Sequence, residues 1–174
     1  MIEGILLKKN LPHVITVLNS SGDFEELHED VEFNIKDIIL GMAELNSNDI
    51  CLLDIHVGKS KEGTTKIKSI EYAGIYKNEQ WIKEPVCNIT LPEGDSIFPF
   101  KSDSWALGEL IVRLTYGKTI PSKFMKSQTL LDKFVDSLDF EYKEQLKKIL
   151  VLDPYKREFT WNIFKEDFNN CTIQ

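Results

Sequence analysis

The spacing of apolar residues changes along the chain and predicts a short N-terminal arm followed by one larger domain. Residues 1–29 mix short apolar stretches at 5–7 and 14–18 with the turn-forming sequence at 19–22, which indicates a turn between two strands. From about residue 30, apolar residues recur at helical spacing. We therefore expect residues 1–29 to form a short arm and residues 30–174 to form the main domain.

Five helices are predicted within this main domain, because apolar residues recur at three- and four-residue intervals. The predicted helices are one from about residue 30 that ends at Asn46, one capped by Ser102 or Asp103 that runs to Tyr116, one at 130–138, one capped by Asp139 that ends at Asp153-Pro154, and one from Thr160. The helix that ends at Tyr116 is apolar on every side, which is typical of a buried central helix. Gly117 is expected to end it.

A few short strands are expected before these later helices. Residues 51–55 and 66–72 have the apolar character of short strands. Residues 77–101 contain three prolines and little periodicity, so they are predicted to form a long ordered loop. The fold class predicted from the sequence is therefore mainly α, with an α+β composition.

The charge and the cysteines exclude several classes of protein. The formal net charge is −7, and only two of the 21 basic residues are arginines, Arg113 and Arg157. Because arginine is the preferred partner of phosphate groups, a nucleic-acid role is not expected. The cysteines Cys51, Cys87 and Cys171 are far apart and indicate reduced thiols of a cytoplasmic or nuclear protein. No apolar run approaches the roughly 20 residues of a membrane span, the N-terminus does not read as a signal peptide, and the histidines lack metal-ligand spacing.

Four segments of the chain are similar to motifs of one family. Residues 102–108 read SDSWALG and resemble the S-D-x-W-[SA]-[LF]-G motif that opens the buried F helix of protein kinases. Residues 110–121 continue this likeness, residues 149–157 resemble the closing L-x-x-D-P-x-x-R signature, and residues 91–93 stand where the family has A-P-E. The resemblance covers about residues 30–168 and implies a fold like the C-terminal lobe of a protein kinase, with residues 1–29 as a remnant of the edge of the N-terminal lobe.

The resemblance assigns structural roles to five residues. Glu93 is expected to form an ion pair with Arg157 that fixes a loop onto the lobe. Asp103 is expected to accept hydrogen bonds from backbone N–H groups of the catalytic-loop segment. Trp105 and Gly108 belong to the same helix motif and are expected to have structural roles in the hydrophobic core.

The catalytic residues of the family are degenerate in this chain. Asp54 matches the aspartate base, Lys59 occupies the position of the metal-binding asparagine, and Glu71 stands for the metal-binding aspartate. An ammonium group at position 59 would repel Mg²⁺. The chain has no G-x-G-x-x-G loop, and neither Lys8 nor Lys9 fits the phosphate-binding lysine. Asp54 is interpreted as a loop residue that bonds the backbone, with a surviving base or another binding role as alternatives.

These features lead to the hypothesis of a pseudokinase without catalytic residues, metal or cofactor. Its function would be to bind another protein as a regulator, scaffold or inhibitor, with a kinase among the candidate partners, and residues 122–138 are expected to offer a docking surface. The alternatives are an atypical kinase, a kinase completed by another chain, and a homodimer. No nucleic acid and no membrane partner is expected.

Overall fold

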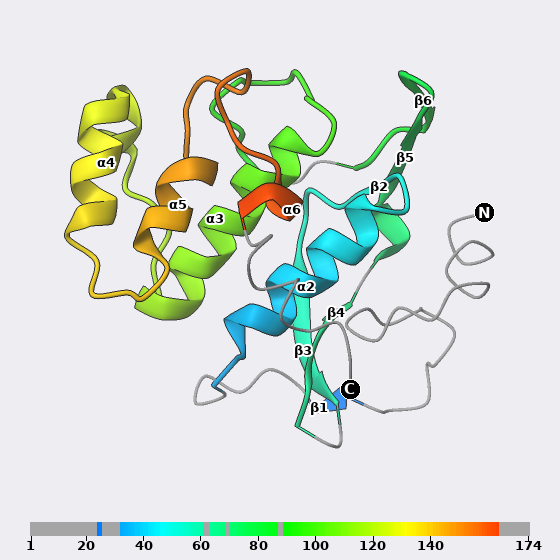
Figure 1. The fold of residues 1–174 in the computed structure, drawn as a ribbon, viewed down its shortest axis with the longest axis horizontal. Helices are drawn as coiled ribbons and strands as arrows, with labels where there is room; N and C mark the ends of the chain where they lie inside the picture. Colours follow the sequence, from blue (N-terminus) through cyan, green and yellow to red (C-terminus); the bar gives the residue numbers. More distant parts are fainter. Residues whose placement is uncertain (1–23, 26–31, 61–62, 69, 87–88, 164–174) are drawn as a thin grey trace. The chain divides into compact units, whose positions relative to one another are not determined.

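The fold combines helices with small antiparallel sheets. The computed structural model describes residues 24–25, 32–60, 63–68, 70–86 and 89–163. Within these ranges the chain forms five α-helices and two three-stranded antiparallel sheets, so its fold class is α+β (Figure 1). No helix in this described part is long and apolar enough to cross a membrane.

The chain divides into two compact units. The first unit comprises Met1–Ile89 and the second comprises Thr90–Gln174. The predicted boundary between residues 29 and 30 lies outside the described residues, so it stays a prediction. The apolar stretches of the arm at 5–7 and 14–18 lie outside the described residues, and within 1–29 the structure describes the strand β1 (Phe24–Glu25).

The first unit is built around the helix α2 (Ile35–Asn46). Its N-terminus is capped by the Asn34 side chain, which accepts hydrogen bonds from the backbone N–H groups of Lys36 and Asp37. Most of the apolar side chains of α2 are buried, as the helical spacing predicted, whereas Ile35 and Leu40 are only partly covered. Four of them are Ile38, Ile39, Met42 and Leu45.

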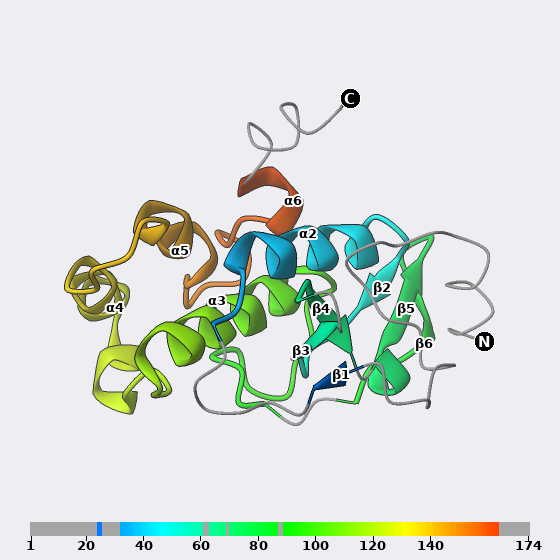
Figure 2. The same cartoon turned by 90° about the horizontal axis from the view of Figure 1, so that it is seen from below.

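Two small sheets complete the first unit. In one sheet the strand order is β1-β3-β4, and in the other it is β2-β5-β6. The remaining strands are β2 (Ile50–Cys51), β3 (His56–Ser60), β4 (Thr65–Lys68), β5 (Gly74–Lys77) and β6 (Gln80–Lys83). The helix α2 packs against β2 of one sheet and β4 of the other, so a single amphipathic helix contacts both sheets (Figure 2).

The sequence predictions for the first unit were wrong at three places. The predicted strand 51–55 is reduced to β2, and the predicted strand 66–72 is β4 followed by the 3₁₀ turn η1 (Ile70–Tyr72). The predicted loop at 77–101 contains β6, which pairs with β5. The turn between β5 and β6 has positive φ at Asn78 and Glu79, as a two-residue hairpin turn requires, but it lacks the glycine that usually marks such a turn.

The second unit is helical. Its elements are α3 (Lys101–Tyr116), the 3₁₀ helix η2 (Ser122–Lys126), α4 (Gln128–Asp136), α5 (Lys143–Ile149) and α6 (Thr160–Ile163). The helix α5 packs against both α3 and α4, and α6 contacts α3 and α5 (Figure 1). The helix α3 is buried from Ser102 to Gly108 and again from Leu110 to Val112, as predicted, but its last turn from Arg113 to Tyr116 is not buried.

The ends of these helices correct two predicted caps. The helix α3 begins after Phe100, whose φ is 62°, and no side chain caps it. Ser102 instead accepts the backbone N–H of Phe98 through its hydroxyl oxygen, so its side chain is used outside the helix. The helix α5 begins at Lys143 and not at Asp139, and no side chain caps it. Gly117 ends α3 as expected, with φ of 65° and its N–H bonded to the Arg113 carbonyl.

Candidate functional site

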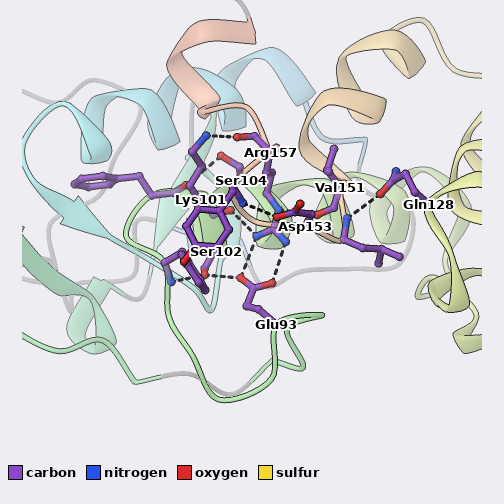
Figure 3. A network of polar contacts seen from close by, with 12 residues as sticks. Glu93, Lys101, Ser102, Ser104, Gln128, Val151, Asp153 and Arg157 are labelled. Atoms are coloured by element: carbon purple, nitrogen blue, oxygen red, sulfur yellow. Dashed lines mark hydrogen bonds and ion pairs between the residues drawn. The ribbon is translucent and has the colours of Figure 1, made fainter.

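A network of buried polar contacts in the second unit surrounds Arg157. The Nη1 and Nη2 atoms of Arg157 donate to the two carboxylate oxygens of Glu93 at 3.0 and 2.9 Å (Figure 3). Its Nη1 also donates to the Lys101 carbonyl at 2.9 Å, and its Nε donates to the Val151 carbonyl at 3.0 Å. Both side chains of the pair are removed from water, at 0% exposure for Arg157 and 4% for Glu93. We call these four residues together with Ser102 the Arg157 cluster.

The Glu93 carboxylate accepts hydrogen bonds from two residues. The Ser102 hydroxyl donates to Glu93 Oε1 at 2.7 Å while Arg157 donates to both oxygens. Burial by itself raises the pKa of Glu93, but the hydrogen bonds from Arg157 and Ser102 and the charge of Arg157 outweigh it and hold this pKa below its ordinary value. The pair is therefore ionised and fully engaged near neutral pH.

Lys101 connects the Arg157 cluster to an aromatic group. Its ammonium donates to the Arg157 carbonyl and lies 3.9 Å from the centroid of the Phe159 ring. The Phe159 ring stacks on Trp161 with 4.5 Å between centroids, and Trp161 meets Phe100 edge to face. Burial lowers the pKa of Lys101, Glu158 opposes this shift, and the charge of Arg157 adds to it. The first turn of α3 is thus tied to the segment that leads into α6.

The other residues of the predicted helix motif lie in the core of α3. Asp103 and Trp105 are completely buried. The Trp105 ring lies under the Arg157 guanidinium, with 5.3 Å between the guanidinium carbon and the ring centroid. Gly108 faces α5, where an added β-carbon would come within 2.6 Å of Leu150 Cδ2. Each of these residues therefore supports the packing of the second unit.

The predicted remnants of a catalytic apparatus all lie in the first unit. Asp54 follows β2, and its carboxylate lies 3.1 Å from Nε2 of His56. Lys59, which the resemblance places in the catalytic loop, lies in the strand β3, where it pairs with Thr65 of β4. The expectation failed because β3 and β4 form a hairpin whose alternation is masked by Gly58. Glu71 lies in η1.

Neither the Arg157 cluster nor the other described side chains form an evident site for a ligand or a metal ion. Four of the five N–H groups of Arg157 are bonded to protein oxygens, and the side chain is completely buried, so the Arg157 cluster presents no exposed ligand position. In the part of the chain that the structure describes, no group of three or more histidine, cysteine, aspartate or glutamate side chains could hold a metal ion. The arrangement is suited to fixing chain segments to one another.

Sequence reasoning also missed a polar connection between α4 and the end of α5. Gln128, the first residue of α4, donates from Nε2 to the Leu150 carbonyl at 3.0 Å and accepts the Leu152 N–H at 2.8 Å through Oε1 (Figure 3). It also donates to Asp132 at 2.8 Å. These bonds satisfy backbone groups at the end of α5. No sequence signal marks a glutamine for this role, because its partners are backbone atoms more than twenty residues away.

No protein-family model matches this chain, and no curated protein matches it either.

Proposed function

We propose that the chain is a pseudokinase related to the C-terminal lobe of protein kinases. The proposal is supported by the SDSWALG sequence at the start of α3, which is buried from Ser102 to Gly108. It is also supported by the ion pair between Glu93 and Arg157, since the resemblance assigns these two residues to each other. These residues come from three separate motifs that meet in one cluster.

The absence of catalysis is proposed from the residues that would handle ATP and Mg²⁺. Lys59 brings an ammonium to the position where the family coordinates the metal, and it lies in a paired strand. Ala73 stands where the family has a flexible glycine, and it is completely buried. A glycine-rich phosphate loop is absent from the sequence.

The function that follows is binding of another protein as a regulator, scaffold or inhibitor. The single observation that carries this proposal is the ammonium group of Lys59, which stands where the family coordinates Mg²⁺ and lies in a paired strand. The Arg157 cluster holds segments of the second unit together and so supports the fold, not a reaction. A stable fold of this kind can function through binding at its surface, without catalysis.

A thermal-shift titration with ATP and Mg²⁺ tests the proposal. We expect the melting temperature of the full chain to stay constant, because a ligand that does not bind the native state cannot stabilise it. A Lys59→Asn variant is the matched control, since it restores the metal-binding residue type at that position. An increase of several degrees for the unmodified chain would favour an atypical or partner-completed kinase and overturn the proposal.

A further inference from the structure

The surface formed by η2 and α4 in the second unit combines apolar and basic side chains. Four apolar residues are only partly covered, and Leu130 is 37% exposed. The rings of Phe124 and Phe134 lie 4.9 Å apart and join η2 to α4. We call this region, which consists of Phe124, Met125, Leu130 and Phe134 together with Lys123, Lys126 and Lys133, the η2–α4 surface.

The three lysines of this surface are exposed. Lys123 lies over the Phe124 ring, with 4.8 Å from Nζ to the ring centroid. No carboxylate among the described residues forms an ion pair with any of the three. Their charges are therefore available in a protein whose net charge is −7.

The acidic residues of α4 do not neutralise these lysines, because both are engaged elsewhere. Asp132 accepts the hydrogen bond from Gln128. Asp136 forms an ion pair with Lys147 of α5, and together with Glu144 it raises the pKa of Lys147. The η2–α4 surface is thus a cationic, partly apolar area on a chain with an overall negative charge.

We infer that the η2–α4 surface binds an acidic segment of a partner protein that also carries aromatic or aliphatic side chains. This inference rests on the proposed role as a protein-binding module and names the chemistry of the partner. Glutamate or aspartate side chains would face the three lysines, and the apolar side chains would cover Phe124 and Phe134. The lysines would also discriminate against basic segments, because like charges would be brought together.

The probe is a synthetic peptide of glutamate, phenylalanine and leucine residues, titrated into the full chain labelled at its methionine methyl groups. The chain has three methionines, and only Met125 belongs to the η2–α4 surface. Met42 is completely buried in α2 and serves as the internal control. We expect the peptide to shift the Met125 methyl signal saturably and to leave the Met42 signal in place. A Met125→Leu variant identifies the signal.

Charge reversal tests the lysines. The triple variant Lys123→Glu, Lys126→Glu, Lys133→Glu is expected to bind the peptide about tenfold more weakly, as the loss of three exposed charge pairs implies. The control triple variant Lys36→Glu, Lys148→Glu, Lys156→Glu changes the net charge equally at exposed positions outside this surface and should keep the affinity. If the first variant fails to fold, raising the salt concentration on the unmodified chain gives the same comparison.

Several outcomes would overturn the inference. They are no saturable shift at Met125, equal affinity for a peptide with lysine in place of glutamate, and equal affinity for a peptide with serine in place of the apolar residues. Self-association that charge reversal abolishes would identify a second copy of the chain as the occupant, and preferential binding to anionic vesicles would identify a membrane. Failure of the proposed function appears separately, as a shift of the melting temperature with ATP and Mg²⁺.

Discussion

The bare α-carbon of Gly108 on α3 faces the side chain of Leu150 at the end of α5. A β-carbon at position 108 would lie 2.6 Å from Leu150 Cδ2 and 2.8 Å from its Cγ. Both distances are far below normal van der Waals contact, so α3 and α5 approach each other at a point where only a hydrogen atom fits. Gly108 lies within a regular helix, so the reason for a glycine here is the close contact with Leu150 and not an unusual backbone conformation.

A Gly108→Ala substitution should therefore destabilise the second unit. Alanine is favoured over glycine within a helix by about 1 kcal/mol, but overpacking of a close core contact costs typically 1–3 kcal/mol. We expect a net loss in the free energy of unfolding, measured by urea denaturation with tryptophan fluorescence. A Trp81→Phe background confines that signal to Trp105 and Trp161 of the second unit.

The double variant Gly108→Ala, Leu150→Ala separates this contact from a general effect on the helix. Leu150 is completely buried, and its truncation alone should cost about 2–5 kcal/mol. Because the new methyl group would occupy space that the leucine vacates, the two effects should be less than additive. Strict additivity would mean that the two residues do not restrict each other.

An Arg157→Ala substitution should be the most damaging single change of a charged residue in the second unit. It leaves the buried Glu93 carboxylate without its main partner, which costs about 3–5 kcal/mol. The other arginine gives a matched control, since Arg113 is exposed and Arg113→Ala should change stability by no more than about 0.5 kcal/mol. Equal effects of the two substitutions in urea denaturation would contradict the role assigned to the Arg157 cluster.

The stability of the second unit should fall in acid because of Glu93. The pKa of Glu93 is lowered in the folded chain, so the unfolded chain binds the proton more readily. The stabilisation from the ion pair is therefore complete above the ordinary glutamate pKa of 4.5 and is lost as the pH falls through the lowered value. Urea denaturation of the unmodified chain and of a Glu93→Gln variant at decreasing pH checks this. The difference between them should narrow below pH 4.5, and a constant difference would argue against it.

An Asp54→Asn substitution should have little effect on stability. Asp54 and His56 form a partly exposed pair, with 21% and 46% of their side chains accessible, and such pairs contribute about 0–1 kcal/mol. Thermal denaturation of this variant should match that of the unmodified chain to within a few degrees. A loss comparable to that expected for Arg157→Ala would contradict this prediction and give Asp54 a structural role.

Helical spacing was the most informative signal in the sequence. The helix α2 and the end of α3 at Gly117 were predicted, because Ile38, Ile39 and Met42 follow the period of a helix and glycine favours the left-handed end. Strands were harder to predict because they are only two to five residues long. The turn at Asn78 and Glu79 has no glycine, so no turn signal in the sequence indicated the hairpin formed by β5 and β6.

The Arg157 cluster could be anticipated only in part. The partnership of Glu93 and Arg157 came from a resemblance between motifs, since nothing in the local pattern links two residues 64 positions apart. The contributions of Ser102 and of the Lys101 and Val151 carbonyls could not be predicted, because they depend on where the backbone of distant segments runs. The basic character of the η2–α4 surface was also hidden by the acidic net charge of the whole chain.

The separation of Glu93 and Arg157 along the chain has a consequence for synthesis on the ribosome. Glu93 leaves the ribosome 64 residues before its partner, and most of the second unit lies between them. Until Arg157 emerges, the carboxylate is better stabilised by water than by a nascent core, which disfavours early closure of the loop that carries it. The second unit should therefore acquire its compact form late, after nearly all of it has been translated, and chains that terminate before Arg157 should be prone to degradation.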